Sequence, residues 1–300
     1  MILCTTPCLE SRNHGRCDEG FAPYTNENEE VSSTTTPLSS RLHHSNGKYS
    51  SPASSPRTVE GRILRGSGAT YTGEWLSGKP QGHGTQTWPD ESQYRGQFHQ
   101  GVAEGDGTFS QPGSSSGYSG QWMNDRSHGY GTWTRADGSS FRGDWAEGKQ
   151  HGHGTLRLPD GGCYIGQFRE GAKCGSGTFT FGGDCVGCSY EGQYISNSCC
   201  GHGIFVWADG RKYEGEWQNG LMHGQGMFVF PDGRRYRGRY ENDTKHGLGT
   251  FEWPDGRRYR GEFVGGQQHG RGAFTDEKGE TKEGSYDHGR CVTSTELAEA

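Results

Sequence analysis

The chain has 300 residues, of which 54 are Gly and only 28% are apolar, far below the roughly 45–50% of an ordinary globular domain. This composition excludes domains built around thick hydrophobic cores, while 8 Trp, 14 Tyr and 13 Phe are too many for a chain that is solvated throughout. The net charge of −6 lacks the basic excess typical of nucleic-acid-binding proteins, so no nucleic-acid partner is expected.

Residues 1–57 are predicted to form a disordered tail, because they are rich in Ser, Thr and Pro and contain no Trp. The first residues lack the basic start and apolar stretch of a signal peptide, and the chain has no run of about 18 apolar residues. Ten cysteines are also too few for a disulfide-built secreted scaffold of this length. We therefore expect a cytoplasmic chain with reduced thiols.

From residue 58 onward the sequence is a repeat with a period of 23 residues. Each of nine units opens with an aromatic residue, here called position 0, and has Gly at +2, +11 and +13 and a second aromatic residue at +4. The opening residues are Tyr71, Tyr94, Tyr118, Phe141, Tyr164, Tyr190, Tyr213, Tyr236 and Tyr259. A register this strict indicates a repeat architecture.

Each unit is predicted to be a β-hairpin. The aromatic residues at 0 and +4 would lie on one face of a first strand, and the Gly at +2 would allow a ring or a backbone to approach closely. Gly, Asp or Asn at +7 marks a turn, and a second strand is expected to follow the glycine pair, with an apolar residue at +15 in eight of the nine units. One hairpin buries too little surface to be stable alone, so each must pair with its neighbours.

The predicted fold is all-β: an elongated, single-layer, antiparallel β-meander of stacked hairpins, preceded by the disordered tail. The array is expected over residues 58–292, with half-units at 61–65 and 282–286, and residues 293–300 as a C-terminal tail. Unpaired edge strands at the ends of such an array would allow a homodimer to form.

The unit YTGEWLSGKPQGHGT, repeated as FRGDWAEGKQHGHGT and YEGEWQNGLMHGQGM, resembles the MORN repeat (membrane occupation and recognition nexus). The resemblance covers roughly residues 60–290 and implies an extended antiparallel β-meander. MORN arrays occur in junction-forming membrane proteins, in flagellar radial-spoke proteins and in cytoskeletal scaffolds of parasite cell division. They also occur beside phosphoinositide kinases, a lysine methyltransferase and small-GTPase exchange factors, and phospholipid binding is widely attributed to them.

The resemblance therefore implies a non-enzymatic scaffold or adaptor that binds protein partners and anionic membrane phospholipids, peripheral to a membrane or the cytoskeleton. Two alternatives remain open. The array is the targeting or regulatory segment of a larger phosphoinositide kinase or methyltransferase, or it belongs to a ciliary or flagellar structure.

Histidines and cysteines are the residues that suggest metal chemistry. A histidine recurs at +10 of several units, as His128, His151, His223, His246 and His269. Because it recurs at one repeat position, it is interpreted as structural, packing against or capping the turn. Cysteines cluster in the fifth and sixth units, where Cys185 and Cys188 form a CxxC pair. Zinc binding by this cluster is the alternative to idle thiols. Because one CxxC is a weak signal, and no GxSxG or phosphate-binding loop is present, we predict no catalytic residues, no cofactor and no metal site.

Basic residues gather in the seventh to ninth units. Positions −1, +1 and +3 are expected to point away from the aromatic face, and there the later units become basic. The candidate residues for binding an anionic lipid or partner are Lys212, Arg235, Arg237, Arg239, Arg258 and Arg260. The alternative is a solvated face whose cations pair with local acids. At about 1 kcal/mol per basic residue near an anionic membrane, such a patch predicts weak, salt-sensitive attachment.

Overall fold

The computed structural model describes residues 57–64 and 66–296, which form 21 strands and one short 3-10 helix. These residues divide into two units. The N-terminal unit contains residues 57–138 and 144–149, and the C-terminal unit contains 139–143 and 150–296. The boundary passes through β8 (Ser140–Ala146) and the start of β9 (Lys149–Arg157). The predicted tail of residues 1–57 lies almost wholly outside the described residues.

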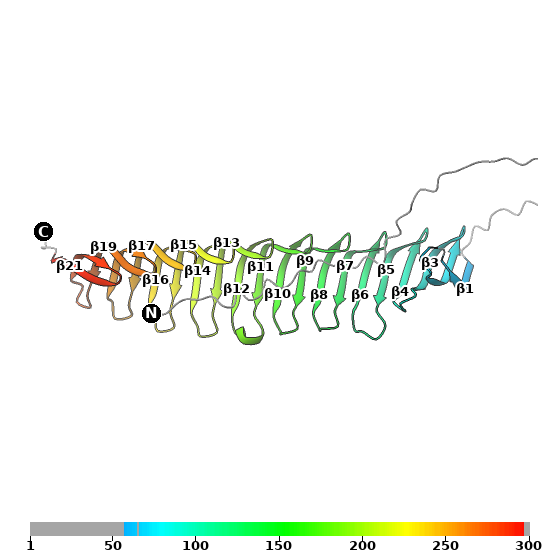
Figure 1. The fold of residues 1–300 in the computed structure, drawn as a ribbon, viewed down its shortest axis with the longest axis horizontal. Coiled ribbons are helices and arrows are strands. Elements are labelled where there is room, and N and C mark those ends of the chain that lie inside the picture. The colour runs from blue at the N-terminus through cyan, green and yellow to red at the C-terminus, as the bar shows by residue number, and fades with distance from the viewer. Residues whose placement is uncertain (1–56, 65, 297–300) are drawn as a thin grey trace, which may run out of the picture. The chain divides into compact units, whose positions relative to one another are not determined.

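The N-terminal unit is an antiparallel meander in which each strand pairs with the next in the chain (Figure 1). Its strands are β1 (Arg57–Ile63), β2 (Thr70–Leu76), β3 (Lys79–Thr87), β4 (Gln93–His99), β5 (Val102–Ser110), β6 (Gly117–Met123) and β7 (Arg126–Thr134).

The C-terminal unit repeats the same meander from β9 to the last strand, without a crossover. Its other elements are β10 (Cys163–Arg169), β11 (Ala172–Thr180), η1 (Gly183–Cys185), β12 (Ser189–Ile195), β13 (Ser198–Val206), β14 (Lys212–Gln218), β15 (Leu221–Val229), β16 (Arg235–Glu241), β17 (Thr244–Glu252), β18 (Arg258–Val264), β19 (Gln267–Thr275), β20 (Thr281–Asp287) and β21 (Arg290–Glu296). The predicted all-β antiparallel meander of stacked hairpins is confirmed within each unit.

The ends of the array contain more strand than the half-units predicted. The N-terminal half-unit expected at 61–65 is β1, which begins at Arg57 and pairs with β2. The C-terminal half-unit expected at 282–286 is β20, and β21 completes it as a tenth hairpin that runs to Glu296.

Two residues with positive φ close each hairpin, as the residue types at +7 predicted. In the seventh unit these are Asn219 at +6 and Gly220 at +7, with φ of 52° and 83°, the conformation of a type I′ turn, whose twist matches that of paired strands. The backbone N–H at +7 also donates to the +9 carbonyl of the preceding hairpin, as from Gly220 to Cys199 at 2.9 Å. The turns therefore tie consecutive hairpins together.

Within each structural unit, the aromatic residues at 0 and +4 form a ladder of edge-to-face contacts. The Tyr236 ring meets Tyr240 of its own strand at 5.3 Å and Phe263 of the next unit at 4.9 Å, with interplanar angles of 89° and 80°. Tyr71 makes the same two contacts in the first unit, with Trp75 and Phe98. This geometry is the favourable one for aromatic pairs, so neighbouring hairpins within each structural unit stabilise each other through the ladder.

Glycines on facing strands make room for the opening rings. The glycines at +2 and +13 face each other across the hairpin, as Gly238 and Gly249 do, and a Cβ on Gly249 would collide with the Tyr236 ring. The Tyr236 hydroxyl donates to the Arg239 carbonyl at 3.0 Å, so burying this hydroxyl leaves no unpaired polar group.

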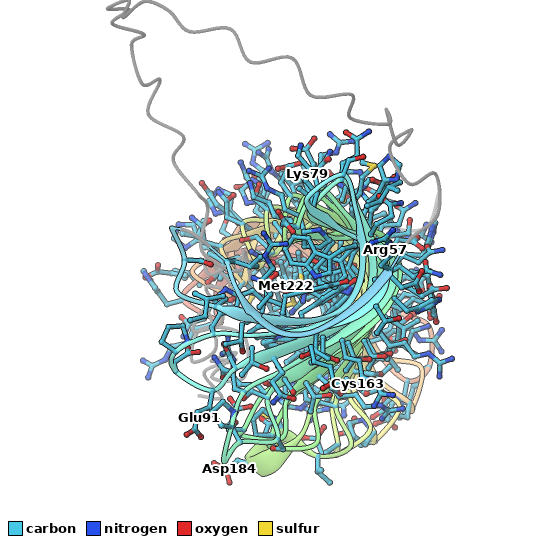
Figure 2. All side chains as sticks on the ribbon, turned by 90° about the vertical axis from the view of Figure 1, so that its right-hand side faces the viewer. Arg57, Lys79, Glu91, Cys163, Asp184 and Met222 are labelled. Carbon is cyan, nitrogen blue, oxygen red and sulfur yellow. The ribbon has the colours of Figure 1, made fainter. Side chains whose placement is uncertain are left out.

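The sequence-based expectation that the second strand follows the glycine pair is wrong, because the pair lies inside that strand. In the seventh unit β15 starts at Leu221 and includes both Gly224 and Gly226. Gly224 has φ of +56° and sits opposite a register shift between Gly215 and Glu216. This β-bulge bends the strand, and Figure 2 shows the strands curling around an inner side on which Met222 lies.

The residue at +3 stabilises the bulge, a role that the sequence analysis did not assign. The Glu216 carboxylate accepts a hydrogen bond from the Gln225 backbone N–H at 2.8 Å, and Gln167 and Gln97 make the equivalent contact in their own units, each at 3.0 Å. The apolar side chains at +15 pack on the inner face: Phe228 is buried, whereas Phe251 is half-buried.

Candidate anion-binding groove

Alternation along β16 and β18 places the predicted basic residues on the outer face. In β16, Tyr236, Gly238 and Tyr240 are buried. The arginines between them are exposed, namely Arg235, Arg237 and Arg239. β18 has the same alternation. The outer face of these strands is therefore the face opposite the aromatic ladder.

Cross-strand register brings Arg237 and Arg260 into one row. Thr250 on β17 is the partner of Arg237 on one side and of Arg260 on the other. Adjacent strands lie about 4.8 Å apart, so the two arginine backbones are roughly 10 Å from each other. The small Thr250 between them leaves both guanidinium groups access to a shared ligand.

A groove of about 980 Å³ runs over these strands in the C-terminal unit. We call it the C-terminal groove. It contains Arg237, Arg260 and a third arginine, Arg271 of β19, together with the exposed Leu248. Its floor is the facing glycines of two hairpins, Gly238 with Gly249 and Gly261 with Gly272, together with Gly284 of β20.

Arg271 and Leu248 were missed by the sequence analysis, which considered only positions −1, +1 and +3. Both occupy +12, between the glycines at +11 and +13. Because a bulge precedes that position, its side chain returns to the outer face. The repeat spacing contained this signal, but using it required the bulge to be known.

Two of the predicted cations are paired with local acids. Lys212 Nζ lies 3.0 Å from Glu214 and holds the pKa of that carboxyl below its usual value through a hydrogen bond and its charge. Arg235 lies 3.3 Å from Glu252. Within the described part of the chain, Arg237, Arg239, Arg258 and Arg260 have no carboxylate within 4.0 Å. Of these four, Arg237 and Arg260 line the C-terminal groove.

The groove is suited to oxyanions. Guanidinium groups donate several hydrogen bonds in a planar fork that matches phosphate or carboxylate oxygens, and a floor without side chains lets a ligand approach the backbone. Thr250 and Ser285 add hydroxyl donors, and Glu283 is the one acidic residue among the lining residues that the structure describes.

Among the described residues the clustered cysteines form no group that converges as metal ligands, and Cys185 of the CxxC pair is disulfide-bonded, so the expectation of reduced thiols is wrong at that residue. Cys188 and Cys199 are buried, and burial raises the pKa of the Cys199 thiol to about 12, so that thiol stays protonated at neutral pH. Among the described residues, the group whose side chains converge as metal ligands instead consists of His269, Asp287 and His288.

Comparison with protein families accounts for most of the chain. The model of the MORN repeat matches nine consecutive segments, which are residues 71–93, 94–115, 118–140, 141–163, 164–186, 190–210, 213–234, 236–257 and 259–281. The chain belongs to the MORN-repeat family. Members of this family are repeat proteins of the scaffold type, and their repeats are not a catalytic fold.

Similarity to curated proteins is confined to short stretches of much longer chains. Alsin from Homo sapiens is 50% identical over 44 residues, which is 15% of this chain and 3% of Alsin. The ALS2 C-terminal-like protein from Mus musculus is 45% identical over 56 residues, which is 19% of this chain and 6% of that protein. The matched stretch is therefore a small fraction of these relatives.

Two solved structures resemble the chain distantly. The TCP domain of Drosophila melanogaster SAS-4, in complex with a proline-rich motif of Ana2, has a TM-score of 0.34 at 12% identity, covering 53% of this chain and 85% of that one. The TCP10 domain of Danio rerio CPAP has a TM-score of 0.27 at 12% identity, covering 80% of this chain and 100% of that one.

The residues described here include no helix long and apolar enough to cross a bilayer.

Proposed function

We propose that this MORN-repeat chain is a non-enzymatic scaffold or adaptor in the cytoplasm that binds protein partners and contacts anionic phospholipid headgroups. The observation that supports the lipid contact is the convergence of Arg237, Arg260 and Arg271 on one glycine-floored groove. Protein partners would use the long outer face of the repeats, which presents different side chains on each hairpin.

The expected strength of the membrane contact follows from the number of available cations. At about 1 kcal/mol per basic residue near an anionic membrane, the three groove arginines contribute about 3 kcal/mol, with smaller additions from the exposed Arg239 and Arg258. Such attachment is weak and salt-sensitive. It would position a scaffold whose main affinity is for proteins.

Vesicle flotation of the full chain tests the lipid contact. Binding is measured to neutral vesicles and to phosphoinositide-containing vesicles across a salt series. The test variant is Arg237→Glu, Arg260→Glu, Arg271→Glu. The matched control is Arg95→Glu, Arg157→Glu, Arg169→Glu, which makes the same change in net charge at exposed arginines of earlier repeats.

The proposal expects binding that needs anionic lipid, weakens with salt, is lost in the test variant and survives in the control. Equal loss in both variants would mean that net charge alone drives adsorption. No binding to either vesicle at low salt would reject the lipid contact and leave a protein-binding scaffold. The predicted homodimer through edge strands is measured separately, by sedimentation velocity.

A further inference from the structure

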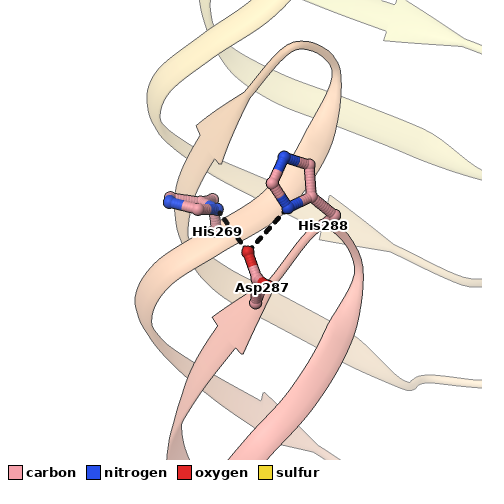
Figure 3. Close-up of side chains that lie close together, drawn as sticks. All are labelled: His269, Asp287 and His288. Atoms are coloured by element: carbon pink, nitrogen blue, oxygen red, sulfur yellow. Dashed lines mark hydrogen bonds and ion pairs between the residues drawn. The ribbon is translucent and has the colours of Figure 1, made fainter.

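Three side chains that are typical metal ligands converge at the turn end of the last two hairpins. His269 comes from β19, Asp287 ends β20, and His288 is the first turn residue after it (Figure 3). Their ligand atoms all lie within 4.8 Å of one another. We propose that these three residues form a zinc-binding site, which departs from the sequence-based prediction of no metal site.

The atoms that converge are two imidazole nitrogens and one carboxylate oxygen. Asp287 Oδ1 lies 3.6 Å from His269 Nδ1 and 2.6 Å from His288 Nδ1. Zinc bonds of about 2.0–2.1 Å in tetrahedral geometry place ligand atoms roughly 3.3 Å apart. The observed distances lie on either side of that value. His288 is 72% exposed, so its ring can move the additional fraction of an ångström.

His269 places an unpartnered ring nitrogen beside the carboxylate of Asp287. Its Nδ1 atom is enclosed by protein and has no hydrogen-bond partner among the described residues, yet it faces a carboxylate. A nitrogen lone pair directed at a carboxylate is repulsive unless a cation or a proton lies between them. A metal ion would supply that cation and would satisfy both groups.

The other repeats show that the cluster is specific to the last pair of hairpins. His128, His151 and His223 occupy the same +10 position and also have an enclosed, unpartnered Nδ1. The positions equivalent to His288 on their neighbouring hairpins are Glu147, Glu170 and Asn242, so no second imidazole is present there. Only at the end of the described array does the repeat bring two histidines to one carboxylate.

The ligand set favours zinc over alkaline-earth ions. Imidazole suits Zn²⁺ and its transition-metal neighbours, whereas Mg²⁺ and Ca²⁺ prefer all-oxygen sites. Three protein ligands leave one tetrahedral position for water or for a group from another molecule. Asp287 and His288 are mostly exposed, so that position is open to solvent.

The test is calorimetric titration of the chelator-treated full chain with ZnCl₂ under reducing conditions. The test variants are His288→Asn and Asp287→Asn. Asn already occupies the position of His288 in other units, as Asn124, Asn219 and Asn242, each with positive φ, so the fold should tolerate it. The matched control is His246→Ala, which removes a half-buried +10 histidine with no second imidazole beside it.

We expect wild type and control to bind one equivalent of Zn²⁺ that each test variant loses or binds at least about tenfold more weakly. Cysteine-bound zinc would appear equally in all four proteins and cancels from the comparison. The zinc-dependent rise in melting temperature should disappear in the same two variants. Unchanged stoichiometry and affinity in His288→Asn and Asp287→Asn would overturn the proposal and leave a His–Asp–His hydrogen-bonded cluster.

Discussion

The grooves over the first and last repeats share one backbone plan and differ in charge. The groove of about 830 Å³ in the N-terminal unit, here the N-terminal groove, has a floor of glycine pairs, as the C-terminal groove does. Where the C-terminal groove has Arg237, Arg260 and Arg271, the equivalent positions of the N-terminal groove hold Thr72, Arg95 and Asp106. At these three positions the C-terminal groove carries three positive charges, whereas the N-terminal groove has a net charge of zero.

This difference separates two layers of information in the repeat. Glycines, opening aromatics and turn residues are common to both regions and set the hairpin, the bulge and the floor. Positions +1 and +12 point outward and are free to vary because they contribute little to packing. The array can therefore change the charge of its outer face from one repeat to the next without changing its backbone.

The largest expected effect tests the shared floor. Gly107→Val in the N-terminal unit and Gly249→Val in the C-terminal unit should each destabilise their unit by about 3 kcal/mol, because the new side chain would overlap the ring of Tyr94 or Tyr236. Chemical denaturation measures the change, with Thr250→Val as control. Near-wild-type stability of either glycine variant would contradict the idea of a common floor.

A gain of function would sharpen the charge comparison. Thr72→Arg combined with Asp106→Arg gives the N-terminal groove the charge pattern of the C-terminal one. Two added cations at about 1 kcal/mol each should strengthen binding to anionic vesicles about 30-fold at low salt. If affinity stays at the wild-type level, the arrangement of charges in a groove does not determine binding.

Replacing the bulge glycine should also destabilise the middle repeats. Gly175→Val and Gly224→Val place a β-branched residue at φ of +56°, which costs about 1–2 kcal/mol and displaces the side chain that caps the bulge. Thermal unfolding should show a smaller loss than at the floor glycines. A loss as large as that of Gly249→Val would mean that the bulge, not the floor, is the more sensitive feature.

Arg271→Ala isolates the residue that the sequence analysis missed. Removing one cation of the C-terminal groove should weaken anionic-vesicle binding about fivefold, or roughly 1 kcal/mol. Arg157→Ala serves as the control at an exposed arginine that does not line the groove. Equal effects of the two changes would show that the groove confers no advantage over the surrounding surface.

The smallest effect concerns a turn that both regions share. Burial raises the pKa of Asp125, while its Oδ1 accepts the Ala103 N–H at 2.7 Å. Asn197 makes the equivalent contact with Lys173 without a charge. Asp125→Asn should therefore slightly raise the melting temperature at pH 7.

The pH dependence of that effect follows from the direction of the shift. A carboxyl with a raised pKa in the folded state contributes stability that is present below its unfolded pKa of about 3.8 and is lost as pH rises through the folded value. The advantage of the Asn variant should thus shrink as the pH falls toward 4. A melting-temperature difference that is constant between pH 3.5 and 7 would contradict this account.

Prediction from sequence succeeded where the cause was local and repeated. The type I′ turn depends on residues that tolerate positive φ, such as Asn219 and Gly220, and the inner face depends on a period of two between Tyr236 and Tyr240. The position of the glycine pair was predicted wrongly. In the sequence, Gly224 looks like a glycine that forms a turn. Only its cross-strand neighbours, which the linear sequence does not display, show that it lies at a bulge inside β15.

The candidate site was predicted in part for the same reason. Arg237 and Arg260 followed from strand alternation, but Arg271 reaches the same groove only because the bulge returns position +12 to the outer face. Lys212 pairs with Glu214 and Arg235 pairs with Glu252. Cations at the same repeat positions in other units, such as Arg258, have no such partner among the described residues, so the repeat position does not predict which cations are paired.

The sequence by itself determined the repeat, the hairpin, the family and the face that carries charge, because each follows from spacing along one chain. The tertiary structure decided the bulge, the membership of the C-terminal groove and the meeting of His269, Asp287 and His288. These features depend on which residues of neighbouring hairpins come into contact, and strand register with side-chain packing settles that only once the chain has folded.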